Sequence, residues 1–330
     1  MHSDGIIVIL AYPDTIVQPA YSESSSKFWP YIGIGTKHAI KAGHAAILLI
    51  KKNQPQVNYF DFGRYITSYG KGRLRSKETD PELQIPIKAT FKNNKLTNLN
   101  QLILWLEAHP EKTHGKGRLI TSTNHAIDFK KATDFIHLLM QQKEIAYGAF
   151  IKNGSNCARF VTDTLINSCT IKKIQQKLKR SYLLTPSPIG NILKGATEKE
   201  VLAVKDQKIT AYNNTSILKE YKQFFKPLDK KLSLLETQLP HKKVFNLNNG
   251  NWLSGIGSGA WFSIEEQLPN LHYRIARYNF KGEKDFEGVF FTDNTFFDAT
   301  KKYKFVHPTN CIEPIILQNN IENVFKKKSN

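Results

Sequence analysis

A cysteine at the start of a predicted helix is the first feature of this sequence that can do chemistry. Cys157 stands in the segment GSNCARFV at residues 154–161, where Ser155 or Asn156 can cap a helix with an apolar stripe. In the first helical turn, the helix dipole favours thiolate over thiol, and free backbone N–H groups can hold an oxyanion. The alternative role of Cys157 is that of a small buried residue packed under the helix.

A nucleophilic thiolate needs a base, and the best candidate in this sequence is His44. It opens an apolar run in the segment KAGHAAIL at residues 41–48. The small side chains of Gly43, Ala45 and Ala46 leave room for another element, such as a helix N-terminus, to approach closely. A histidine in an apolar strand is otherwise a buried core residue, so the interpretation rests on the combination with Cys157.

A third residue would orient the imidazole by accepting its other N–H. If a turn centres near Lys52 or Asn53, the next strand places Asp61 opposite His44 or within one pair of it. Asp61 is therefore the predicted orienting residue. Tyr59 shares its face and is an alternative, and a surface carboxylate is the simpler role for Asp61.

Four motifs carry a resemblance to a known family: AYPDT at 11–15, GHAA at 43–46, YFDFGRY at 59–65 and NCARFV at 156–161. Together they resemble the circularly permuted NlpC/P60 papain-like superfamily, which includes lecithin:retinol acyltransferase-like enzymes, and most closely a group of bacterial proteins. In the permuted branch histidine precedes cysteine, as here. The resemblance covers about residues 5–185.

The resemblance implies that Cys157 is the nucleophile, His44 the base and Asp61 the polar third residue. Many family members have a second histidine in the third role, which the segment 57–62 lacks.

The hydrophobic pattern predicts an α+β fold with an antiparallel sheet. A Ser/Pro/Tyr-rich loop at 13–31 should border a cleft. Proline and a change in composition predict three parts: a permuted papain-like domain at 1–190, a helical linker region at 191–240 with a helix at 215–237, and a β-rich accessory domain at 241–330. Predicted strands of the first part are 5–11, 44–50 and 57–62, and predicted helices are 97–108, 128–143 and one opening near 156.

Further residues are candidates for binding substrate. Tyr12 ends the first strand and can lie beside the nucleophile, and Tyr59 and Arg64 are close in sequence to Asp61. Arg64, Arg73 and Arg75 can bind a carboxylate or phosphate, although a solvated loop is the simpler explanation for this cluster. No spacing of ligand residues predicts a metal or a cofactor.

Composition narrows the class of protein. The 330 residues are 40% hydrophobic, which excludes a wholly disordered chain, and no apolar run reaches the length of a membrane helix. Three cysteines without a CxxC spacing and the lack of a signal-peptide pattern favour the cytoplasm. The net charge of +19 would attract an anionic partner through a basic surface.

These observations predict a cysteine-dependent hydrolase or acyltransferase, amidase-like or peptidase-like, that acts on an amide or ester bond in a peptide, a peptidoglycan fragment or a lipid. Two alternatives remain open. One is a non-catalytic binding or scaffold protein with a papain-like core, and the other is a basic nucleic-acid-binding protein, which the charge alone suggests.

Overall fold

The computed structural model describes residues 3–20, 23, 31, 35–36, 38–213, 228 and 250–328. The helix predicted at 215–237 lies outside these residues, apart from residue 228. The chain forms two compact units. The first consists of Met1–Gly63, Leu74–Ser76 and Leu83–Leu234, and the second of Arg64–Arg73, Lys77–Glu82 and Leu235–Asn330.

The first unit is built on an eight-stranded sheet in the order β10-β9-β7-β1-β2-β3-β4-β8. Its centre is antiparallel, with Ile9 of β1 opposite both Ile47 of β2 and Ser122 of β7. The predicted strands at 5–11, 44–50 and 57–62 are confirmed as β1, β2 and β3. The strands of this sheet are β1 (Gly5–Tyr12), β2 (His44–Lys51), β3 (Val57–Gly63), β4 (Lys71–Arg75), β7 (Leu119–Ile127), β8 (Ile145–Ala146), β9 (Leu202–Lys205) and β10 (Lys208–Ala211).

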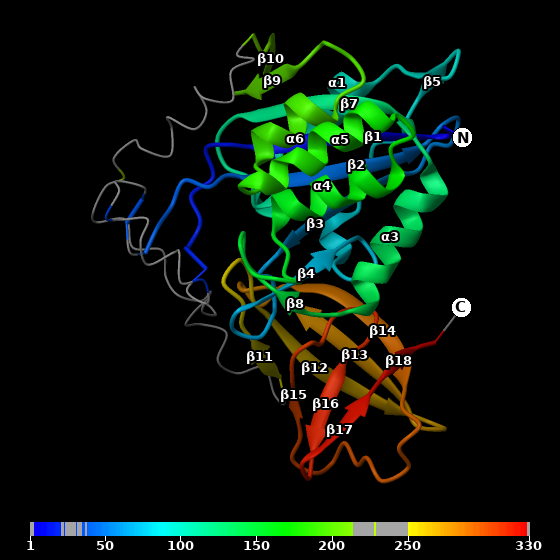
Figure 1. Cartoon of the computed structure of the whole chain (residues 1–330). Helices are drawn as coiled ribbons and strands as arrows, with labels where there is room; N and C mark the ends of the chain where they lie inside the picture. The colour runs from blue at the N-terminus through cyan, green and yellow to red at the C-terminus, as the bar shows by residue number, and fades with distance from the viewer. Residues whose placement is uncertain are drawn as a thin grey trace. The chain divides into compact units, whose positions relative to one another are not determined.

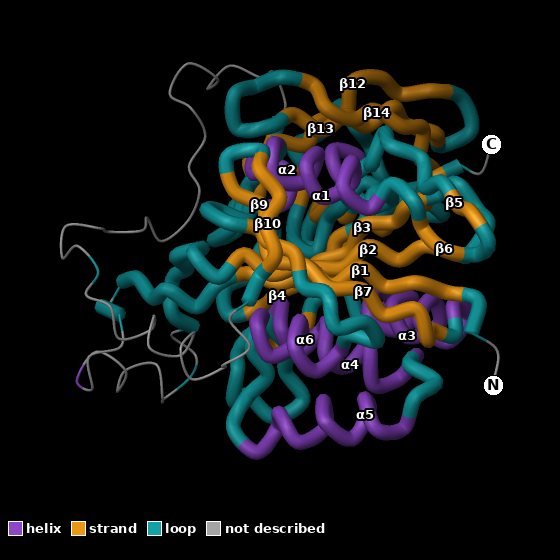
Figure 2. The backbone as a smooth tube through the Cα atoms, turned by 90° about the horizontal axis from the view of Figure 1, so that it is seen from above, coloured by secondary structure: helices purple, strands orange, loops and turns teal. Residues whose placement is uncertain are grey.

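The central strands have continuous apolar sequences, because both faces of the sheet are covered. All eight residues of β1 are buried. Odd-numbered residues such as Ile7 and Ile9 face α3 to α6, whereas Ile6 and Val8 pack on the side of α1 (Figures 1 and 2). The helices are α1 (Leu99–Ala108), α2 (Pro110–Thr113), α3 (Phe129–Gln141), α4 (Cys157–Ser168), α5 (Lys172–Lys179) and α6 (Pro188–Gly195), with 3-10 turns η3 (Pro81–Leu83) and η4 (Arg180–Leu183).

Three of these helices, α1, α3 and α4, confirm the periodicities read from the sequence. The basic stretch from Lys172 to Arg180 is also a helix, because Ile174 and Leu178 supply a narrow buried stripe. Ser187, in the predicted break, caps α6 by accepting a hydrogen bond from Gly190, with Pro188 in its first turn.

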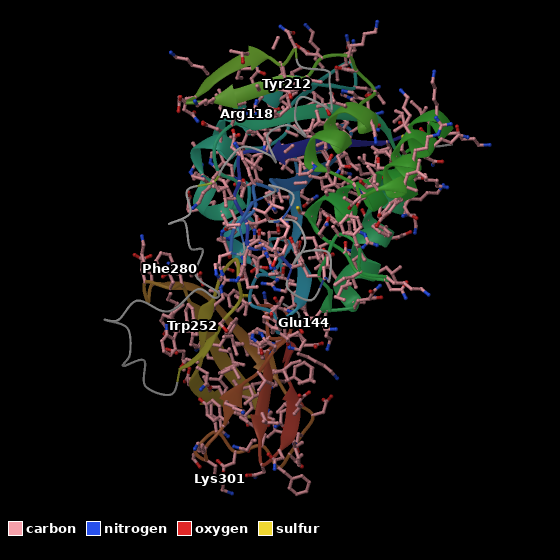
Figure 3. All side chains as sticks on the ribbon, turned by 60° about the vertical axis from the view of Figure 1, so that its left-hand side comes forward. Arg118, Glu144, Tyr212, Trp252, Phe280 and Lys301 are labelled. Carbon is pink, nitrogen blue, oxygen red and sulfur yellow. The ribbon has the colours of Figure 1, made fainter. Side chains whose placement is uncertain are left out.

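The second unit is β-rich. A five-stranded antiparallel sheet has the order β11-β12-β13-β14-β18, and a three-stranded sheet has the order β15-β16-β17. Aromatic residues such as Phe262, Tyr273 and Phe290 form its core, and Trp252 (labelled in Figure 3) makes an edge contact with Trp261. The strands are β11 (Asn251–Leu253), β12 (Ala260–Leu268), β13 (His272–Tyr278), β14 (Lys284–Phe291), β15 (Lys304–Phe305), β16 (Ile315–Gln318), β17 (Ile321–Val324) and β18 (Lys326–Lys327), and elsewhere in the chain β5 (Phe91–Lys92) pairs with β6 (Lys95–Leu96).

Ion pairs within the second unit hold its segments Arg64–Arg73 and Lys77–Glu82 against β13. Arg73 donates to both carboxylate oxygens of Asp80 at 2.6 and 2.7 Å. Arg277 of β13 donates to Asp80 at 3.2 Å, to Asp285 at 2.9 Å and to Glu82. Burial lowers the pKa of Arg277, but Cys311 and the surrounding carboxylates outweigh it and raise the pKa well above its usual value.

The predicted fold class is therefore confirmed: an α+β chain with a large antiparallel sheet and a separate β-rich C-terminal region. The first unit continues past residue 190 through α6, β9 and β10. No helix in the described part of the chain is long and apolar enough to cross a membrane.

Candidate active site

Cys157 is the first residue of α4, where the sequence analysis placed it. Asn156 has extended backbone angles, and its Oδ1 accepts a hydrogen bond from the N–H of Arg159 at 2.9 Å. The preceding loop is tied to β8, since Ser155 N donates to Ala146 O at 2.9 Å. The thiol is thus held at the positive end of a capped helix and is largely buried.

His44 is the first residue of β2 and lies opposite Tyr12 of β1. Gly43 before it has a φ of +74°, and a Cβ there would lie 3.1 Å from the carbonyl oxygen of Tyr12, so the tight entry to the strand requires glycine. The imidazole is buried and interacts with the side chain of Cys157 through a hydrogen bond and through charge. The structure therefore brings the predicted base and the predicted nucleophile together.

Asp61 on β3 accepts a hydrogen bond from Nε2 of His44 at 3.3 Å. Its strand partner is Ala46, two residues along from His44, so the carboxylate and the imidazole meet diagonally on one face. The predicted register, with Asp61 opposite His44 or within one pair, is corrected accordingly. The pairing of β2 with β3 centres between Asn53 and Gln54, later than the expected centre near Lys52 or Asn53, and Asn53 has a φ of 60°.

Arg75 is the site residue that the sequence analysis did not identify as such. Its Nε and Nη2 donate to the two carboxylate oxygens of Asp61 at 2.9 and 2.6 Å, and its side chain is fully buried. Arg75 is close in sequence to Arg64 and Arg73, but both of these belong to the second unit, where Arg73 pairs with Asp80. The solvated-loop explanation is wrong for Arg75 and for Arg73, because both are buried ion-pair partners.

These contacts determine the charge of the site. Burial alone would raise the pKa of Asp61, but Arg75 and His44 outweigh it and hold the pKa below its usual value. Burial alone would lower the pKa of His44, but Asp61 and Cys157 raise it from 6.5 to about 9. His44 is therefore an imidazolium at neutral pH, next to an ionised Asp61.

The two predicted tyrosines surround this group. Tyr59 donates its hydroxyl to Asp61 at 3.0 Å. The ring of Tyr12 is stacked against His44, with 6.3 Å between ring centroids, and burial raises the pKa of Tyr12 well above its usual value. Both tyrosine rings are buried, and the partners observed for them are His44 and Asp61. Contact of Tyr12, Tyr59 or Arg64 with substrate stays a prediction.

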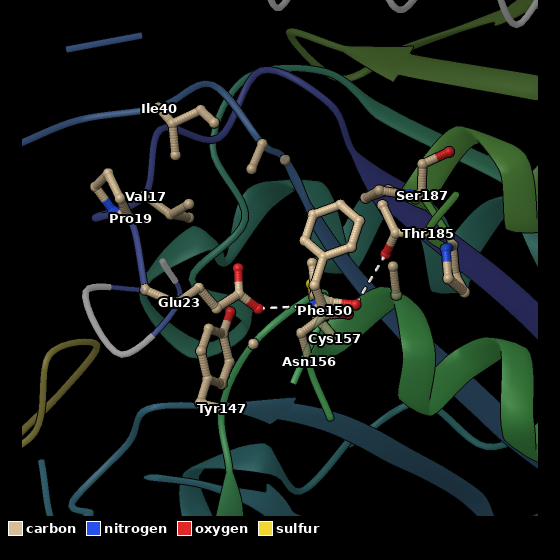
Figure 4. A pocket seen from close by; sticks show the side chains of 18 of the residues that line it. Val17, Pro19, Glu23, Ile40, Tyr147, Phe150, Asn156, Cys157, Thr185 and Ser187 are labelled. Atoms are coloured by element: carbon tan, nitrogen blue, oxygen red, sulfur yellow. Dashed lines mark hydrogen bonds between the residues drawn. The ribbon is translucent and has the colours of Figure 1, made fainter. Parts of the chain in front are cut away.

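A cavity of about 490 Å³ opens beside Cys157 (Figure 4). Its lining comes from the loop after β1, the loop before α4 and the turn before α6, so the loop predicted at 13–31 does border a cleft. Among the described residues that line the cavity, Glu23 is the only charged side chain, and it accepts a hydrogen bond from the N–H of Phe150 at 2.7 Å. The apolar lining includes Val17, Pro19, Ala20, Ile40, Leu184, Pro186 and Pro188.

All three cysteines are free, and Cys169 and Cys311 are buried elsewhere in the fold. No group of three His, Cys, Asp or Glu side chains in the described ranges is placed to hold a metal ion. The chemistry that the arrangement offers is therefore that of a thiol, an imidazolium and a carboxylate.

Fold and site together define an α+β protein with a buried Cys–His–Asp arrangement at the edge of an apolar cavity. The family model described as type VI secretion system effector TseH-like matches residues 7–174, just over half of the sequence and all three of these residues. The chain belongs to this family. Residues 250–328 match a second model, described as the DUF6695 C-terminal domain.

One solved structure, the crystal structure of the type VI secretion system effector TseH, is 15% identical in sequence. The match covers 64% of this chain and 99% of that chain, with a TM-score of 0.39. No curated protein matched the sequence. Family membership supports the predicted papain-like hydrolase fold in general terms, whereas the NlpC/P60 subgroup and the circular permutation remain predictions.

Proposed function

We propose that this protein is a cysteine-dependent hydrolase or acyltransferase that acts on an amide or ester carbonyl. The observation that carries the proposal is the contact between Cys157 at the start of α4 and a His44 that is itself bonded to Asp61. Nucleophilic catalysis by cysteine requires a thiol in contact with an imidazole, and a third group that orients the imidazole.

The reaction begins with the Cys157 thiolate paired with the His44 imidazolium. The sulfur attacks the carbonyl carbon, and the oxyanion is held by backbone N–H groups at the start of α4, where those of Cys157 and Ala158 lie closest to the helix end. His44 then transfers its proton to the leaving nitrogen or oxygen as the bond to carbon breaks, which leaves a thioester on Cys157. Water, activated by neutral His44, completes hydrolysis, and an amine or alcohol would complete acyl transfer.

The family assigns a setting to this chemistry. A type VI secretion system effector acts after delivery by that system, so the proposed place of action lies outside the producing cell. The cytoplasmic location predicted from composition stays a prediction beside this proposal.

The test is a reaction that needs no substrate. Iodoacetamide at pH 6, followed by mapping of the modified peptides, should label Cys157 well ahead of Cys169 and Cys311, because His44 stabilises the thiolate. Cys311 is a good internal control, since burial raises its pKa to about 12. His44→Ala should slow the labelling of Cys157 at pH 6.

Equal labelling of the three cysteines, together with an unchanged rate of Cys157 labelling in His44→Ala, would refute the proposal and favour a non-catalytic binding protein. Cys157→Ser separates a loss of the nucleophile from a loss of the fold. It should leave the circular dichroism spectrum unchanged and remove the fast-reacting thiol.

A further inference from the structure

We infer that the first unit docks on an anionic lipid bilayer through α5 and the turn after it, and that the cavity beside Cys157 takes a lipid acyl chain. The docking surface is defined as the exposed residues of the segment 171–184. The assignment of a lipid acyl ester or amide as substrate rests on the proposed function, whereas docking itself does not.

The first part of the docking surface is a helix with cations on its exposed side. Ile174 and Leu178 point into the core of the first unit, and the lysines of α5 are exposed. No Asp or Glu occurs in the segment 171–184. Its cations are all exposed: Lys172, Lys173, Lys177, Lys179 and Arg180.

Such a cluster has a specific electrostatic consequence. An anionic bilayer strengthens binding about fivefold for each Lys or Arg close to its surface. The effect decreases with added salt, because salt screens charges that are exposed.

The second part of the surface is apolar and directly follows the cations. Leu183 is 85% exposed and Leu184 is 77% exposed, whereas Ser181 in the same turn is buried and anchors it. Single exposed leucines are common on proteins, but two in succession next to five cations are the pattern of an interfacial segment. An anionic bilayer is complementary to both features. Its headgroups attract the cations, and its acyl region accepts the leucines.

The docking surface continues into the cavity. Leu184 belongs to both, and Thr185 donates from its hydroxyl to the carbonyl oxygen of Ala149 at 3.4 Å, which connects this turn to the loop before α4 (Figure 4). Pro186 and Pro188 extend the apolar wall. Cys157 lines the same cavity. A chain that leaves the bilayer at Leu184 therefore enters a space that borders the nucleophile.

The lining favours an acyl chain over a peptide as the occupant. A buried peptide needs hydrogen-bond partners for its own N–H and C=O groups, and an acyl chain needs none. The walls are mainly apolar, and a volume of about 490 Å³ lies within the usual range for a small-molecule site.

Docking is tested with the full chain carrying Cys157→Ala, so that no turnover affects the result. Vesicles of phosphatidylcholine with 30% phosphatidylglycerol should sediment the protein, and vesicles of phosphatidylcholine alone should bind it much more weakly. The double substitution Leu183→Ser and Leu184→Ser should weaken binding more than tenfold. Leu138→Ser is the matched control, because Leu138 is 54% exposed on α3 and outside the surface, and it should bind like the parent protein.

Three results would overturn docking. The first is an absence of binding to the anionic vesicles. The second is an equal loss of vesicle binding in the Leu138→Ser control and in the double variant. The third is displacement of the protein from vesicles by millimolar glycerol phosphate, which would identify a site for a soluble phosphate and not for a bilayer.

The acyl chain is tested with the unsubstituted protein and p-nitrophenyl esters of increasing chain length. Each added CH₂ should raise kcat/KM about fourfold until the cavity is filled, because each contributes its transfer free energy. A flat series in a protein whose Cys157 labels rapidly would refute the acyl site and leave the proposed function intact. No turnover together with slow labelling of Cys157 would refute the proposed function instead.

Discussion

Protonation of His44 should make the stability of the first unit depend on pH in a defined direction. The folded-state pKa is about 9, compared with 6.5 for an unperturbed histidine. Below pH 6.5 both the folded and the unfolded chain hold this proton. Between pH 6.5 and about 9 only the folded chain holds it, so the free energy of unfolding decreases as pH rises across this window.

The size of this change in stability follows from the shift in the pKa of His44. A rise in pKa from 6.5 to about 9 corresponds to about 3 kcal/mol of stability that is present at pH 6 and lost by about pH 10. Since His44 is buried, this contribution is not reduced by solvent screening. His44→Gln removes the proton-binding group and should remove this component of the pH dependence.

The measurement is urea unfolding followed by circular dichroism between pH 6 and pH 10. His137→Gln is the control, because His137 is exposed on α3 and its loss should leave the pH dependence unchanged. Proton NMR of the imidazole provides a second readout, with an expected midpoint near pH 9. A difference in unfolding free energy between the unsubstituted protein and His44→Gln that stays constant from pH 6 to pH 10 would refute the reasoning.

Three other substitutions have expected outcomes. Asp61→Asn should lower kcat at least tenfold with little change in KM, because orientation of His44 matters most in the transition state, and steady-state kinetics on any accepted ester would show it. Asn156→Ala should cost about 1 kcal/mol of unfolding free energy through loss of the α4 cap, measured by urea unfolding, with Asn167→Ala near the other end of the helix as control. Arg277→Met should cost the second unit about 3 kcal/mol by leaving the buried Asp80 with fewer partners, and an unchanged melting temperature would contradict this.

Local signals allowed much of the first unit to be predicted. Apolar runs identified β1 and β2, and the small and polar residues before Cys157 identified the start of α4. The proximity of His44 and Cys157 followed from residue type, since small neighbours permit a close approach. These inferences depend on neighbours in sequence, which is the information that a single chain carries most directly.

Non-local contacts could not be predicted in this way. The diagonal placement of Asp61 depends on the length of one turn, and a change of one residue in the turn alters the register. The role of Arg75 depends on β4 lying beside β3, whereas Arg73, two residues earlier, pairs with Asp80 in the other unit. Nothing in the spacing of the two arginines distinguishes these outcomes.

The ion pair between Arg75 and Asp61 also bears on which residue carries the proton in the proposed reaction. Two hydrogen bonds from Arg75 keep Asp61 ionised in spite of its burial, so the carboxylate stabilises the imidazolium of His44 and does not take its proton at neutral pH. A resting imidazolium means that the proton for the leaving group is already on His44. The buried arginine thereby favours the charge state in which the proposed acid is ready before substrate binds.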